Sequence, residues 1–386
     1  MSAAAITRVA MTTAVGPDAR TSAAAFRAGI SRARELAHFA ALDEEDTDVG
    51  PIAGHVAVPL ALHAEGLGKM VALGADVLRG LLGTSDGPDR RRTGLYLAVP
   101  NYSLREESFV DVNQPVPAAR HHAGLDEEDE DEPPKRSIAF AAECRDHLVD
   151  RLTRAARVDF APVASGLNFG DGCAFLKALD EAMTALASGA ADRCIVGGID
   201  SYLDVPSLEW GMLRRRLKSE SNPVGFAPGE AAVFLELALP ESGDAGVGTY
   251  VSKPGFGEEP GQVPGSTEEP PRGEGLAQAI GAVLAGHDRP VGLVIADLNG
   301  EPHRAMDWGY ALIRAGSEHP GLRTARVWAP AESFGETGCA SPGLAIGVAA
   351  EALHRGYARA DSILVLASSD TGDRAATIVS RSPARG

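Results

Sequence analysis

Cys173 is the residue of this sequence whose surroundings best suit a nucleophile. It follows the stretch Leu-Asn-Phe-Gly-Asp-Gly and directly precedes a predicted helix over 174–188. A helix N terminus lowers the pKa of a nearby thiol and so favours the reactive thiolate. Asp171 acts in the opposite direction, because a neighbouring carboxylate raises a thiol pKa. Two interpretations stay open, a reactive thiol and a small buried residue in the first helical turn.

The other cysteines and the histidines show no spacing typical of a metal site. Cys144, Cys194 and Cys339 form no Cys-x-x-Cys pair, and the ten histidines include no His-Glu-x-x-His. We therefore expect no bound metal and no cofactor. Cysteines without a paired spacing fit a reducing, cytoplasmic compartment.

The charge and hydropathy of the chain exclude two classes of partner. The 386 residues carry a formal net charge of −17, which repels the phosphate backbone of a nucleic acid. No run approaches the eighteen or so apolar residues that a membrane helix needs, and the first residues do not resemble a secretory signal. We expect neither nucleic acid nor membrane as a partner.

The elements that must position Cys173 follow a repeated order. In the first half, strands are predicted at 6–15, 94–99, 158–163, 193–198 and 231–239, and helices at 21–38, 138–155 and 174–188. In the second half, strands are predicted at 249–253, 291–297, 324–329, 362–367 and 375–380, and helices at 275–285, 303–316 and 343–356. Each half therefore reads β-α-β-α-β-α-β-β. Fully apolar strands such as VGLVIADL are typical of a sheet that helices cover on both faces.

This duplication predicts an α/β protein built as a five-layer α-β-α-β-α sandwich. We expect an N-terminal half over 1–245 and a C-terminal half over 246–386. The first half contains a mostly helical insert near 50–85. It also contains an acidic loop near 121–137, whose sequence DEEDEDEPP at 126–134 repels itself and favours an exposed loop.

The duplicated order resembles the thiolase fold, and several stretches are similar to β-ketoacyl synthases in particular. The segment LKALDEAMTALASGAADRCIVGGID at 176–200 resembles the helix after the family nucleophile and the strand that follows. The segment GFAPGEAAVFLE at 225–236 is similar to the family's Gly-Phe-x-x-Gly-Glu-Gly-Ala strand entry. The segment GETGCASPGLAIGVAAEALHR at 335–355 resembles the Gly-His-x-x-Gly loop and its helix. The resemblance spans nearly the whole chain.

A ketosynthase uses a cysteine and two histidines, or a histidine and an asparagine, and the resemblance locates these positions here. Gly172 falls at the cysteine, and Cys173 reaches that place only through a one-residue gap. Asp297 falls at the first histidine, with His303 six residues later. Glu336 falls at the second histidine, where it is either a base or a cap of the helix that follows. We keep Cys173, Asp297 and Glu336 as candidate catalytic residues.

The same motifs supply candidate binding residues. These are Gly172, Phe226 of the Gly-Phe motif, Asn299 and His303 after the strand at 291–297, and Gly338 of the loop at 335–338. The family's glycine-rich C-terminal turn is also altered, because it reads Asp-Thr-Gly-Asp-Arg at 370–374. Four positions thus depart together from the chemistry of the family.

These departures lead to one main hypothesis and one alternative. The chain has lost the condensing reaction and serves as a binding, assembly or accessory subunit. In the alternative, it is an atypical acyl-thioester transferase or condensing enzyme with Cys173 as nucleophile, Asp297 or Glu336 as base and amides near Gly338 as oxyanion donors. The resemblance implies a homodimer, or a heterodimer with a related subunit, through the strand before the nucleophile, expected at 158–163. A protein partner or an acyl carrier is the expected ligand, and the acidic loop is either a docking arm or a solvated insertion. No motif supports an unrelated α/β enzyme.

Overall fold

Buried strands from both halves of the chain form one mixed sheet in the computed structural model, which describes residues 3–42, 48–58, 61, 63–83, 92–106, 112, 136–240, 248–262 and 269–382. The first half contributes β1 (Ala3–Thr12), β4 (Thr93–Pro100), β5 (Ser165–Gly170), β6 (Arg193–Ser201) and β7 (Glu230–Ala238). The second half contributes β8 (Thr249–Ser252), β10 (Leu293–Ile295), β11 (Arg326–Trp328), β12 (Ser362–Ser368) and β13 (Asp373–Ser380), and the short β9 (Gly255–Glu258) pairs with β13.

The strand order is the same in the two halves. Read outward from the middle, it is β1-β7-β6-β4-β5 on one side and β8-β13-β12-β10-β11 on the other. Because the strands occur in the chain in matching order, the topology confirms the predicted duplication. Antiparallel pairing of β1 with β8, from Ala3–Ser252 to Ile6–Thr249, joins the two halves into one continuous sheet.

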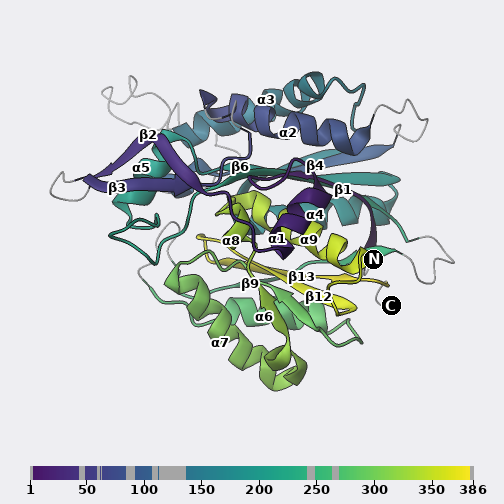
Figure 1. Ribbon diagram of the computed structural model, residues 1–386. Helices are drawn as coiled ribbons and strands as arrows, with labels where there is room; N and C mark the ends of the chain where they lie inside the picture. The colour runs from purple at the N-terminus through teal and green to yellow at the C-terminus, as the bar shows by residue number, and fades with distance from the viewer. Residues whose placement is uncertain are drawn as a thin grey trace, which may run out of the picture.

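Helices divide the molecule into the five layers that the sequence predicts (Figure 1). The helices α2 (Gly66–Leu82) and α3 (Arg136–Ala156) cover one outer face, and α6 (Glu274–Leu284) and α7 (Pro302–Glu318) cover the other. Between the two halves of the sheet lie α1 (Ala19–Arg27), α4 (Gly172–Ser188) and α9 (Ser341–His354). The last helix is buried on nearly all sides, which its alanines and glycines permit.

Three predicted elements differ from the structure. The helix predicted over 21–38 ends at Arg27, since Gly29 takes a positive φ of 67°, and β2 (Arg34–Leu42) follows. The insert near 50–85 is only partly helical, because β3 (Asp48–Gly54) pairs with β2 before α2 begins. The strand predicted at 158–163 is wrong by several residues, because the strand before the nucleophile position is β5 at Ser165–Gly170.

Two predictions fall on residues outside those that the structure describes. The acidic loop at 126–134 belongs to them, as does the boundary between residues 245 and 246. Among the described residues, no helix is long and apolar enough to cross a membrane.

Candidate functional site

Four connections meet where parallel strands end, and together they enclose the candidate site. They are the β5–α4 junction at 171–172, the β10–α7 loop at 296–301, the loop at 335–338 between α8 (Ala331–Phe334) and α9, and the end of β12 at 366–368, just before the β12–β13 turn. Carboxyl ends of parallel strands are the usual ligand-binding edge of α/β sheets. Asp171, Gly172, Asp297, Glu336 and Gly338 line one cavity there.

Gly172, which the resemblance places at the family's nucleophile position, has no room for a side chain. A Cβ atom built on it would lie 2.8 Å from the carbonyl oxygen of Ser368. Contacts this short do not occur at real Cβ atoms, so the backbone of β12 would have to move. The local backbone therefore requires glycine where the resemblance places the cysteine.

Cys173 lies beside the site and does not line the cavity. Its side chain is 1% exposed, and its thiol donates weakly to the carbonyls of Asp373, at 3.3 Å, and Ala367, at 3.6 Å. Burial raises the pKa of this thiol well above its usual value, and the carboxylates of Asp171 and Asp373 raise it further. A buried thiol of this kind is not ionised near neutral pH.

Glu336 is held by its own loop and by the β10–α7 loop. It accepts hydrogen bonds from Asn299 Nδ2 at 2.7 Å and from the Gly338 amide at 2.8 Å, with Ser341 Oγ at 3.4 Å. Burial raises the pKa of its carboxyl group, against the opposing effect of Arg304. Glu336 thus binds the first backbone amide of the 3₁₀ turn η6 (Gly338–Ala340), which leads into α9.

Asp297 and His303 take part in different contacts at the start of α7. Asp297 accepts a hydrogen bond from Arg304 Nη1 at 3.3 Å. The imidazole of His303 lies 3.9 Å from Glu301 and its buried Nε2 has no hydrogen-bond partner. Burial, together with the charge of Arg304, lowers the pKa of His303 to about 4, so the ring is neutral at pH 7.

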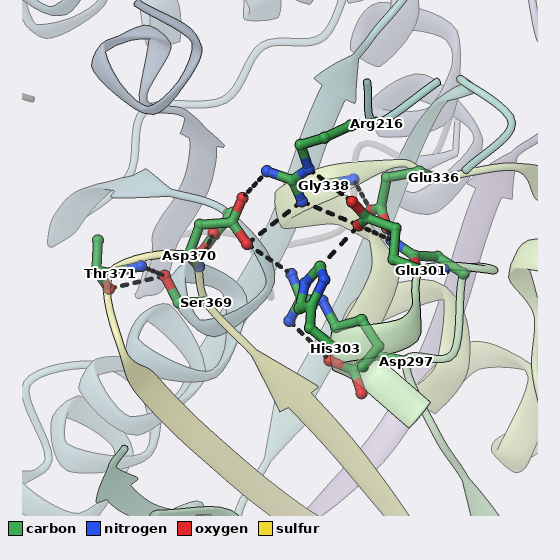
Figure 2. A network of polar contacts seen from close by, with 12 residues as sticks. Arg216, Asp297, Glu301, His303, Glu336, Gly338, Ser369, Asp370 and Thr371 are labelled. Atoms are coloured by element: carbon green, nitrogen blue, oxygen red, sulfur yellow. Dashed lines mark hydrogen bonds and ion pairs between the residues drawn. The ribbon is translucent and has the colours of Figure 1, made fainter. Parts of the chain in front are cut away.

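An ion network that the sequence analysis missed connects these loops (Figure 2). Arg216 binds Glu301 through Nε at 2.6 Å and Asp370 through Nη1 at 2.5 Å. Arg304 joins the same network by binding Asp370 at 3.2 Å. Burial would raise the pKa of Asp370, but Arg216 and Arg304 outweigh it and lower that pKa. Arg216 is the last of three consecutive arginines, and nothing in the run distinguished it.

Phe226 supports this network from outside the cavity. Its ring packs at a steep angle against Tyr202, with centroids 5.3 Å apart, and the Arg216 guanidinium lies 5.7 Å from it. Arg216 also lies over Trp210 at 4.9 Å. Cation–π contacts with these two rings help to hold the Arg216 guanidinium in place.

The site is crowded and acidic. Asp171, Asp297, Glu301, Glu336 and Asp370 meet two arginines, and burial with the nearby Asp370 charge raises the pKa of Asp171. The cavity volume is about 40 Å³, which is enough for a few water molecules. Backbone amides that could serve an oxyanion are already used, since Gly338 donates to Glu336 and Cys339 donates to Asp200. Among the described residues, no cluster of acidic, cysteine or histidine side chains has the arrangement of a metal site.

Solved ketosynthases have the same fold. The ishigamide ketosynthase/chain length factor is 18% identical and matches 98% of this chain and 99% of its own, with a TM-score of 0.62. A second match is a chain of the AntDE:AntF complex, a type II PKS acyl-carrier protein in complex with its ketosynthase bound to the hexaketide. It is 14% identical, and the match covers 99% of this chain and 99% of that chain, with a TM-score of 0.66.

A third similar structure is the oxazolomycin ketosynthase domain of Streptomyces albus JA3453. It is 15% identical, and the match covers 100% of this chain and 75% of that chain, with a TM-score of 0.67. No family model and no curated protein matches the sequence. The chain therefore has a thiolase-like, ketosynthase-like fold, as the sequence predicted.

Proposed function

We propose that this chain is an accessory subunit on a ketosynthase scaffold, which binds a related subunit and does not itself catalyse condensation. Gly172 is the observation that carries the proposal. The nucleophile position has no side chain, and the Ser368 carbonyl occupies the space that one would need. Condensation through a covalent thioester requires a nucleophile at that place.

The neighbouring cysteine does not replace the missing nucleophile. Cys173 is buried, its thiol is directed to backbone carbonyls of the second half, and its pKa is raised. The Gly338 amide, which an acyl-transfer reaction could use for an oxyanion, donates to Glu336. These contacts favour a site without catalytic activity over the acyl-transferase alternative.

The ion network supports the same proposal because it fills the centre of the site. Arg216, Glu301 and Asp370 are each less than a tenth exposed, and their contacts leave a cavity of about 40 Å³. An acyl chain would have to break buried ion pairs to enter, which is costly. The four cysteines are free and buried, so we place the protein in the cytoplasm.

Acylation tests the loss of catalysis. The purified chain is incubated with a panel of acyl-CoA and acyl-carrier thioesters, and its intact mass is measured. We expect no stable adduct on the wild type or on Cys173→Ala, with Cys144→Ala as a matched buried-cysteine control. An adduct that maps to Cys173 and disappears only in Cys173→Ala would restore the transferase alternative.

The free edge of β5 is the surface through which we propose that a subunit binds. Among the described residues β5 pairs with β4 alone and ends the sheet. The backbone carbonyls of Ala164 and Gly170 accept hydrogen bonds from the backbone amides of Leu95, in β4, and Asn101, directly after β4. Since alternate residues face opposite sides of a strand ladder, the backbone of Leu167 faces the open edge. An open edge of this kind is a template for strand pairing.

A proline at Leu167 tests this surface without touching the β4 ladder. Leu167→Pro removes an outward N–H, whereas the control Leu167→Ala keeps it. We expect a dimeric mass by sedimentation for the wild type, or a complex with a co-expressed ketosynthase. Leu167→Pro should weaken either assembly and Leu167→Ala should preserve it. A monomer that also fails to bind any co-expressed ketosynthase would argue against an accessory subunit.

A further inference from the structure

A second pocket, open to solvent and unrelated to the candidate site, lies where α1 packs against α9. We call it the arginine pocket, defined by Arg20, Arg27, Arg355 and Tyr357, with alanines of the 23–28 stretch between them. Its volume is about 450 Å³, within the range of small-molecule sites. The candidate site is at the N terminus of α9 and the arginine pocket at its C terminus. The 14 residues of α9 separate the two by about 21 Å.

The charge of this pocket is opposite to that of the chain. Its lining contains three arginines and no carboxylate, whereas the sequence has a net charge of −17. Arg355 Nε binds Glu351 at 2.7 Å, and no salt bridge of the described residues involves Arg20 or Arg27. A local positive potential on an acidic protein attracts anions to that place.

Tyr357 contributes a donor without an acceptor. Its hydroxyl is buried and makes no hydrogen bond among the described residues. Arg27 lies over its ring, 4.5 Å from the centroid, and Trp328 stacks on it at 28° with centroids 6.3 Å apart. The side chains that a ligand can reach are those of the arginines, which are exposed.

The spacing of the arginines defines the anion. Arg20 and Arg27 are seven residues apart on α1, two turns along one face or about 10 Å. A diphosphate offers one phosphate group to each of two separated arginines, and the forked guanidinium groups match phosphate oxygens. We infer that the arginine pocket binds the diphosphate group of a small-molecule ligand. This inference does not rest on the proposed function.

Calorimetric titration of the full chain with pyrophosphate, at constant ionic strength, tests the site. We expect binding that is at least tenfold tighter than that of orthophosphate, and a nucleoside diphosphate that binds about as tightly as pyrophosphate. Arg27→Gln and Arg20→Gln should each weaken pyrophosphate binding about tenfold or more, the loss expected for a charged hydrogen bond. Tyr357→Phe should weaken it by less.

Two further variants make the result decisive. Glu351→Gln frees Arg355 from its partner and should tighten pyrophosphate binding several-fold. Arg154→Gln on α3 makes the same charge change at a side chain that is 78% exposed and should leave binding unchanged. Circular dichroism checks that each variant is folded. No pyrophosphate binding at millimolar concentration would overturn the inference. So would equal weakening by Arg154→Gln, or binding of a polyglutamate peptide in place of pyrophosphate.

Discussion

Arg216 and Glu301 form a two-pronged ion pair in the interior, with Nε 2.6 Å from Oε1 and Nη2 2.9 Å from Oε2. The same guanidinium also binds Asp370. Glu301 precedes α7 and Asp370 lies in the β12–β13 turn, so one side chain of the first half fixes two connections of the second. The cavity that remains beside this network is only about 40 Å³.

Removal of Arg216 should destabilise the fold strongly. Arg216→Met leaves Glu301 and Asp370 buried without their main counter-ion, which costs about 3–5 kcal/mol. Urea unfolding measures the loss of unfolding free energy. The matched control is Arg214→Met, an exposed residue of the same arginine run, for which we expect a change within about 0.5 kcal/mol. Equal effects of the two variants would contradict the structural role of the network.

A side chain at Gly172 should be unfavourable, however small. Gly172→Ala places a Cβ atom 2.8 Å from the Ser368 carbonyl, and overpacking of this kind costs about 1–3 kcal/mol. The control is Gly80→Ala in α2, where nothing lies within 4 Å of the new atom and stability should rise by up to about 1 kcal/mol. In thermal unfolding, we expect Gly172→Ala to lower the midpoint temperature and Gly80→Ala to raise it. A stable Gly172→Ala would mean that the nucleophile position can hold a side chain.

His303 should make stability depend on pH. Its pKa is about 4 in the folded chain against 6.5 for an ordinary histidine, so the unfolded state binds the proton more readily. Stability is full above pH 6.5 and falls as pH drops towards 4, by about 3 kcal/mol from this group. Unfolding free energies at several pH values test this, and His303→Gln should show a shallower slope between pH 4 and 6.5. Parallel curves for the two proteins would show that His303 titrates normally.

Cys173 should resist alkylation in the folded protein. Its thiol is buried and its pKa is raised, so iodoacetamide at pH 8 should leave it unmodified, whereas urea should expose all four cysteines. Peptide mapping after timed labelling identifies the sites. Fast native labelling at Cys173, faster than at Cys144, would show that the thiol is accessible and ionised.

Much of the fold was predictable from the sequence, because hydrophobic patterns act locally. β12 is buried along its whole length and β13 from its second residue onward, and α9 begins two residues from its predicted start. β5 was misplaced because Ser165–Gly170 contains two glycines and an asparagine, which have low strand propensity. Its place is set by pairing with β4, a contact that sequence patterns do not encode.

The candidate site was predictable only in part, for a reason of distance along the chain. Gly172, Asp297 and Glu336 were found through positions of the family motif, and they do line one cavity. Arg216 lies 85 residues from Glu301 and 154 from Asp370. No local rule joins residues so far apart, and the role of Arg216 becomes visible only when three loops are brought together.

The pairing of β1 with β8 has a consequence for how the chain is made. When residues up to the end of β7 have left the ribosome, the first five sheet strands are complete, but β1 still has one unpaired edge. The inner surface of α4 is also bare at that moment, because α9, which covers it, has not been synthesised. Biosynthesis thus passes through an incomplete molecule with an unpaired strand edge and an exposed apolar helix face. Until β8 and α9 have been made, this edge and this face are exposed surfaces through which the incomplete chain can associate with other chains.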